Sequence, residues 1–169
     1  MTTYIALLRA VNVGGTGKLP MSELRAMCES IGCTDVRTYI ASGNVVFAST
    51  LSKASIKAKL EACLAGYAGK PVGVAIRTGP EMAAVLAANP FRSAPPNRTV
   101  AIFLDGPPPA DTLAQMSGQQ TEEVALGKDE IYVHYGDGMA HTKLKIPAAK
   151  TGTARNMNTV ATLSEWAAT

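Results

Sequence analysis

The sequence contains few aromatic residues and few charged residues. Aromatic side chains make up 5% of its 169 residues, so aliphatic side chains and alanine must fill the core. Charged residues make up 17%, below the usual quarter, whereas hydrophobic residues reach 47%. This balance excludes an intrinsically disordered chain and suits one domain or two small, closely joined ones. The net charge of +3 is too small to require a polyanionic partner.

Cysteine and histidine are also scarce. The three cysteines, Cys28, Cys33 and Cys63, have no paired spacing, which argues against a disulfide framework. Cys28 and Cys63 fall on the apolar faces of expected helices, so we expect both to be small core residues. The two histidines, His134 and His141, have no cysteine or acidic residue at ligand spacing, and we therefore expect no metal site.

Long hydrophobic runs are absent as well. No run approaches the length needed to span a membrane, and the first residues do not combine positive charge with a signal-type apolar segment. We therefore expect a soluble, cytoplasmic protein with no membrane partner. The oligomeric state is left open.

The first half of the chain has the element order of a split βαβ fold. Apolar runs predict strands at residues 3–11, 36–41, 45–49 and 72–76. Between them, helical stripes begin at Pro20 and at Ser52, where proline and serine are typical first residues. The turn at Gly43 and Asn44 suits a hairpin because either residue can adopt a positive φ. The order βαββαβ is ferredoxin-like.

The second half repeats this order in outline. We expect strands at 99–104, 124–126 and 131–135, and helices at 81–88, 111–116 and from about residue 158. The prediction is an α+β protein with two ferredoxin-like halves, residues 1–79 and 80–169, packed closely together. Each half would be an antiparallel sheet with helices packed on one face. The shared element order leaves a duplication open, although the two halves have no matching residues.

A glycine-rich loop, Gly14-Gly15-Thr16-Gly17-Lys18, follows the first strand. It is not a phosphate-binding P-loop, because Leu19 stands where serine or threonine would bind the metal ion. A dinucleotide fingerprint fails for want of a second βα unit with its ribose-binding acid. What remains is a loop with Lys18 ahead of a helix, which can hold an anion. The alternative is a turn that needs glycine for its shape.

The C-terminal region is basic. No acidic residue lies between Gly138 and Ser164, whereas four basic residues do: Lys143, Lys145, Lys150 and Arg155. Arg155 directly precedes a helix whose N-cap is expected at Asn156 or Asn158. A guanidinium beside open helix amides suits a phosphate or a carboxylate. The alternative is ordinary capping, with Arg155 bonded to a carbonyl or an acidic side chain.

The sequence also bears on two other classes of function, RNA recognition and catalysis by a nucleophilic serine. RNA-recognition sheets of this topology stack bases on aromatic residues of central strands. Tyr4 and Phe47 lie on the corresponding strands, but neither region matches the RNP pattern. Ser42 lies in no Gly-x-Ser-x-Gly elbow and has no evident base. Nucleic-acid binding is therefore not favoured, and the sequence leaves enzymatic activity open.

Five motifs, in order along nearly the whole chain, carry a family resemblance. They are Tyr4–Gly15, Met21–Leu24, Tyr39–Phe47, Asn89–Phe91 and Arg155–Thr159. They resemble the bacterial family called "domain of unknown function 1697". Met157 stands where relatives often carry tryptophan. The resemblance implies a cytoplasmic α+β protein with ferredoxin-like parts, and it brings no established activity or catalytic residues.

The leading hypothesis is a module that binds a small anion, such as a nucleotide or another phosphorylated molecule, without a cofactor. The candidate ligand-binding residues are Arg9, Asn12, Lys18, Arg155 and Asn156. One alternative is a nucleic-acid-binding protein that uses the basic C-terminal segment. The other is a structural or partner-binding protein without a small-molecule ligand.

Overall fold

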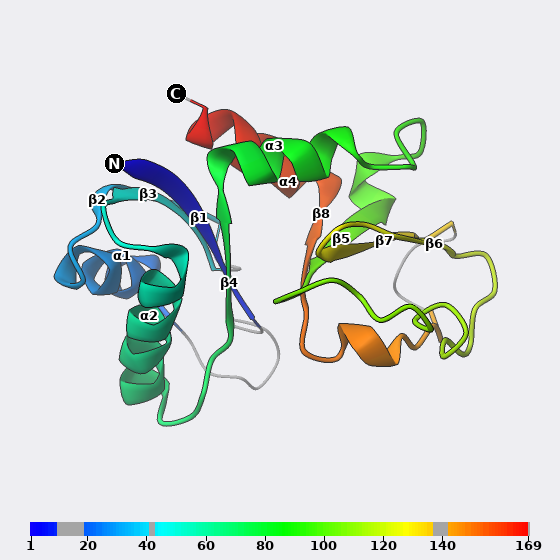
Figure 1. The fold of residues 1–169 in the computed structure, drawn as a ribbon, viewed down its shortest axis with the longest axis horizontal. Coiled ribbons are helices and arrows are strands. Elements are labelled where there is room, and N and C mark those ends of the chain that lie inside the picture. The colour runs from blue at the N-terminus through cyan, green and yellow to red at the C-terminus, as the bar shows by residue number, and fades with distance from the viewer. Residues whose placement is uncertain (10–18, 41–42, 137–141, 169) are drawn as a thin grey trace. The chain divides into compact units, whose positions relative to one another are not determined.

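The computed structural model describes residues 1–9, 19–40, 43–136 and 142–168 (Figure 1). The chain forms two compact units. The first comprises Met1–Met82 with Leu163–Thr169, and the second comprises Ala83–Thr162. Each unit contains a four-stranded antiparallel sheet, which confirms the predicted α+β class.

The sheet of the first unit is built around its first strand. Its strands are β1 (Thr2–Leu8), β2 (Thr34–Tyr39), β3 (Asn44–Ser49) and β4 (Val74–Thr78), in the order β2-β3-β1-β4. The five residues from Tyr4 to Leu8 are all buried, as expected for an apolar strand covered on both faces. The strand ends at Leu8, earlier than the predicted residue 11, and Arg9 lies in a bend.

Helices α1 (Met21–Ser30) and α2 (Lys53–Ala68) cover one face of this sheet (Figure 1). The buried side chains of β1 that face them are Tyr4, Ala6 and Leu8. At 16 residues α2 is the longest helix among the described residues, and none of these helices is long and apolar enough to cross a membrane.

The ends of both helices follow from their sequences. After α1, Gly32 adopts a φ of +93° and the Cys33 N–H donates to the Cys28 carbonyl at 3.0 Å, a Schellman arrangement. At the start of α2, the Ser52 hydroxyl accepts from the Ser55 N–H at 3.2 Å, which confirms the predicted cap. Cys28 is fully buried as predicted, whereas Cys63 is only half-buried.

The second unit has a sheet of the same strand order. Its strands are β5 (Thr99–Phe103), β6 (Glu123–Leu126), β7 (Glu130–His134) and β8 (Thr153–Asn156), in the order β6-β7-β5-β8. Two short 3-10 helices belong to this unit: η1 (Pro96–Arg98) precedes β5, and η2 (Pro147–Ala149) lies between β7 and β8, where α2 stands in the first unit. Two further α-helices, α3 (Gly79–Ala87) and α4 (Met157–Ala167), follow β4 and β8.

The helix predicted at residues 111–116 is wrong. The segment forms hydrogen-bonded turns, such as the 3.0 Å bond from the Gln115 N–H to the Asp111 carbonyl. Three prolines at positions 107–109 precede it, and Gly118 follows with a φ of +72°. One turn of helix between such breaks gains too few hydrogen bonds to offset the cost of nucleation.

The two sheets also agree in register at their edge strands. Arg77 of β4 lies opposite Ile5 of β1, and Arg155 of β8 lies opposite Ala101 of β5. One residue later, each edge strand leads into a helix. The repeat that the sequence indicates only in outline is therefore a repeat of topology and register, with different side chains at most positions.

Candidate functional site

Two of the candidate residues, Arg155 and Asn156, lie together where β8 runs into α4. In register, Arg155 lies opposite Ala101, on the opposite face of the sheet from Ile102, which belongs to the apolar core of this unit. The strand therefore directs the Arg155 side chain away from that core, because successive side chains of a strand alternate between faces.

Asn156 caps α4. Its Oδ1 accepts a hydrogen bond from the Thr159 N–H at 2.9 Å, so of the two predicted caps the structure selects Asn156 over Asn158. This cap uses Oδ1, so the Nδ2 donor of the same amide is not part of it. The positive end of the dipole of α4 therefore lies at the residue that directly follows Arg155 in the sequence.

Arg155 is a buried cation. Arg155 is 9% exposed, and its Nη1 donates to the Ala154 carbonyl at 2.9 Å. Burial lowers the pKa of the guanidinium to about 10, because the charged form loses hydration. A bond to a carbonyl is the alternative that the sequence gave for this arginine, and Arg155 has a further interaction besides it. The depressed pKa adds that the cation lies in a poorly hydrated environment.

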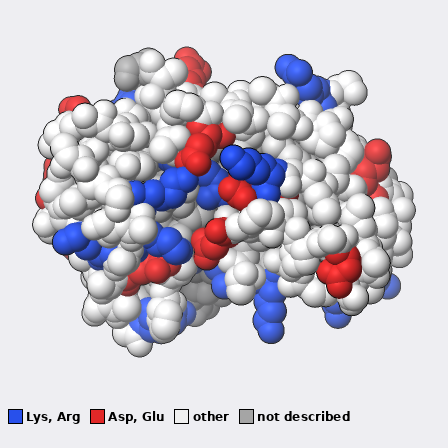
Figure 2. Space-filling model, in the orientation of Figure 1, with Lys and Arg blue, Asp and Glu red and all other residues white. Residues whose placement is uncertain are grey.

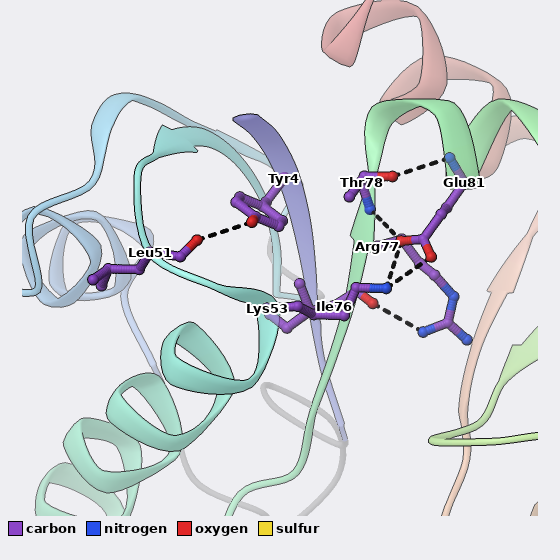
Figure 3. Close-up of polar contacts among 7 residues, drawn as sticks. All are labelled: Tyr4, Leu51, Lys53, Ile76, Arg77, Thr78 and Glu81. Carbon is purple, nitrogen blue, oxygen red and sulfur yellow. Dashed lines mark hydrogen bonds and ion pairs between the residues drawn. The ribbon is translucent and has the colours of Figure 1, made fainter. Parts of the chain in front are cut away.

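The first unit contains a counterpart of this arginine, Arg77, which was not among the candidate residues. Arg77 of β4 is 7% exposed, and its Nη1 donates to the Ile76 carbonyl at 3.0 Å (Figure 3). The next residue, Thr78, caps α3 as Asn156 caps α4. A shared pattern could have revealed the pair: an arginine, then a residue suited to capping, then a helix.

The start of α3 is a capping box (Figure 3). The Glu81 N–H donates to Thr78 Oγ1 at 3.2 Å, and the Thr78 N–H donates to Glu81 Oε1 at 2.8 Å. Lys53 Nζ donates to both carboxylate oxygens of Glu81, at 2.6 and 2.8 Å. Burial raises the pKa of Glu81, but the bonds from Lys53 and Thr78 outweigh it and the pKa is lowered. This cluster is a structural link between helix ends.

Of the other three candidate residues, only Arg9 lies in the part of the chain that the structure describes. Arg9 belongs to the first unit, where its side chain is exposed and its N–H donates to the Gly73 carbonyl at 2.9 Å. Asn12 and Lys18, with the glycine loop, lie outside the described residues. Arg155 and Asn156 belong to the second unit, so the three candidates that the structure describes are divided between the two units.

The aromatic residues considered for base stacking are not available for it. Tyr4 is 6% exposed and Phe47 is 1% exposed, with their ring centroids 6.0 Å apart in the core beside α1 and α2. The Tyr4 hydroxyl donates to the Leu51 carbonyl at 2.9 Å (Figure 3). Stacking an RNA base on either ring would require opening this core, so the RNA-recognition mode is wrong for these residues.

Charge of both signs is mixed on the face seen in Figure 2. Lys and Arg side chains lie there among Asp and Glu side chains. In the first unit, two such pairs are Lys53 with Glu81 and Lys57 with Glu61, the latter at 2.8 Å. In the second unit, three lysines of the basic segment are exposed: Lys143, Lys145 and Lys150.

The described residues contain no arrangement typical of metal binding or of a catalytic triad. No group of three or more histidine, cysteine or acidic side chains among them could hold a metal ion. His134 is half-buried, with Nδ1 3.4 Å from Thr99 Oγ1 and its ring 6.1 Å from that of Phe91. His141 and Ser42 lie outside the described residues.

The chain is similar to one family and to a solved structure. The model of the family described as "Protein of unknown function (DUF1697)" matches residues 1–132. The structure of conserved bacterial protein SP0830 from Streptococcus pneumoniae is 28% identical in sequence, with a TM-score of 0.79 over 97% of each chain. Among curated proteins, none matches the chain significantly. Because the family model spans more than half of the chain, the chain belongs to the DUF1697 family, whose function is unknown.

Proposed function

We propose that this protein binds a small anionic molecule, such as a nucleotide or another phosphorylated compound, where β8 meets α4. Arg155 would pair with the anion through its guanidinium, and Asn156 would contribute its Nδ2 group. Arg9, Asn12 and Lys18 are kept as further candidate ligands. Among the residues that the structure describes, no nucleophile with a neighbouring base supports a reaction, so the proposal is limited to binding.

The burial of the Arg155 cation is the observation that carries this proposal. A guanidinium that is 9% exposed, with a pKa lowered to about 10 by burial, sits in an environment where charge is costly. An anion bound there would offset this cost, and the attraction between the two charges would be stronger than at an exposed lysine. The adjacent start of α4 also favours negative charge, because its open N–H groups and the helix dipole are positive at that end.

Two variants and a ligand panel test this proposal. The panel contains inorganic phosphate, nucleotides, sugar phosphates, simple carboxylates, and short RNA and DNA oligomers. Thermal unfolding of the wild type is compared with Arg155→Lys, which keeps the charge but loses the planar fork. Arg92→Ala is the matched control, because Arg92 is an exposed arginine of the same unit.

A small phosphate at about a hundred times its dissociation constant should stabilise the wild type by roughly 2.7 kcal/mol, or several degrees. The shift should fall in Arg155→Lys and persist in Arg92→Ala. A response to oligomers alone that fades steeply with salt would favour the nucleic-acid alternative instead. No response to any compound, with a mass that depends on concentration, would favour the partner-binding alternative.

A further inference from the structure

A second site, unrelated to Arg155, is a surface hollow of about 520 Å³ in the first unit. It lies between the C-terminal half of α1 and strand β2. Its lining residues are Arg25, Glu29, Asp35, Val36 and Arg37. The volume is within the range of about 300–1,000 Å³ found for small-molecule sites. All of the lining residues belong to one unit.

Strand β2 is irregular where it lines the hollow. It is an edge strand of its sheet, and its register with β3 shifts between Thr34 and Arg37. Within this bulge, Asp35 adopts a φ of +52°, in the left-handed region that non-glycine residues seldom occupy. Bulges and strained residues concentrate at sites where a strand has to aim a side chain. They also prevent a regular extended peptide from pairing with this edge.

The charged side chains that line the hollow differ in their interaction partners. Arg25 Nε lies 3.5 Å from Glu29 Oε2, a loose and exposed ion pair. The Asp35 side chain makes no hydrogen bond or ion pair with any residue that the structure describes. Its carboxylate is therefore available to a ligand.

Arg37, in contrast, is held in place by the C-terminal helix. Its Nη2 donates to the Trp166 carbonyl at 2.7 Å, and its guanidinium carbon lies 5.2 Å from the centroid of the Trp166 ring. The indole also packs edge-on against Tyr39, with 5.2 Å between ring centroids. These contacts fix the position of one cation at the rim of the hollow and leave its other donors for a ligand.

We propose that this hollow binds a small zwitterion that carries both an ammonium group and a carboxylate, such as a free amino acid or a dipeptide. The lining holds two arginines and two acids, so its formal charges cancel and it offers no net attraction to a simple anion or cation. A ligand whose own charges are separated can use both signs at once. Its ammonium group pairs with Asp35, and its carboxylate pairs with Arg37.

Binding should be weak, because four of the five lining side chains are exposed and only Val36 is buried. Each exposed charge pair contributes a factor of up to about five to the binding constant. Glycylglycine is the test probe, titrated into isotope-labelled protein while backbone amide resonances are followed by NMR. N-acetylglycine, which has only the carboxylate, and glycinamide, which has only the ammonium group, are the matched probes.

We expect glycylglycine to shift the amide resonances of Asp35, Val36 and Arg37 saturably, with a dissociation constant on the order of 40 mM, as two factors of about five imply. Each singly charged probe should bind about fivefold more weakly. Asp35→Asn should reduce the affinity for glycylglycine to that for N-acetylglycine. Glu23→Gln removes an exposed carboxylate of α1 outside the hollow and should change nothing.

Asp35→Gly is the second variant, because glycine adopts the positive φ without strain and keeps the bulge folded. It should lose glycylglycine binding as Asp35→Asn does. Equal effects of all three probes, no saturable shift, or unchanged binding in both Asp35 variants would overturn the proposal. Arg155→Lys should still bind glycylglycine, so this result is independent of the proposed anion site.

Discussion

Replacing Arg155 with methionine should leave the stability of the protein nearly unchanged while removing its proposed ligand site. The lowering of the Arg155 pKa to about 10 corresponds, at 1.36 kcal/mol per pKa unit, to roughly 3 kcal/mol of unfavourable burial. The unfolded arginine stays charged well above this pH, so this cost is fully present at neutral pH and diminishes only above about pH 10. Methionine has a similar length and carries no charge.

Most of this gain is offset by contacts that the variant loses. The bond from Arg155 Nη1 to the Ala154 carbonyl disappears, and Arg155 has a further interaction besides this bond. A hydrogen bond of a charged group contributes about 1.5–3 kcal/mol. We therefore expect Arg155→Met to change the free energy of unfolding by less than about 1.5 kcal/mol in either direction. The melting temperature should move by about 2–4 °C per kcal/mol.

Urea denaturation at neutral pH measures this change, with Arg92→Ala as the control for loss of an exposed arginine. Arg92→Ala should alter the free energy of unfolding by less than about 0.5 kcal/mol. A loss of more than about 2 kcal/mol in Arg155→Met would refute the reasoning. It would mean that the guanidinium stabilises the native fold, and the case for a cation held ready for an anion would fail with it.

Three further predictions concern the first unit. Glu81→Gln removes a carboxylate whose pKa in the folded state lies below 4.5, so the wild type should lose stability as the pH falls below 4.5 and the variant should lose less, as followed by urea denaturation at several pH values. Iodoacetamide should modify half-buried Cys63 well before Cys28, because burial raises the pKa of the Cys28 thiol to about 12; mass spectrometry of the folded protein would contradict this if both reacted together. Leu60→Ala should reduce the free energy of unfolding by about 2–5 kcal/mol, because Leu60 is a fully buried residue of α2; a smaller loss in urea denaturation would contradict this and mean that the cavity collapses.

Local signals in the sequence were enough for most elements of the fold. Ser52 and Gly32 mark a helix start and a helix stop that the structure confirms, because capping depends on a few neighbouring residues. The segment at 111–116 was misjudged because a single apolar turn after three prolines has no tertiary support for a helix. Its fold depends on surroundings that a local pattern does not contain.

The candidate sites were less accessible to sequence reasoning. Asn156 could be expected as a cap, but the burial of Arg155 depends on which face of β8 it occupies, and that is set by register with β5. The hollow beside Asp35 had no signal at all. A bulge and a positive φ at an aspartate arise from how β2 pairs with β3, some ten residues further along the chain.

Helix α4 has a consequence for the order in which the protein is made. Its residues up to Thr162 belong to the second unit, whereas Leu163 onward, including Trp166, belong to the first. The ribosome therefore synthesises the whole second unit before the residues that seat Arg37 and Tyr39 emerge. Until then the part of the β2 edge beyond the bulge, at Arg37 and Tyr39, lacks its indole cover. A nascent chain at that stage can mispair along this regular stretch of the edge, and the arrival of Trp166 covers it.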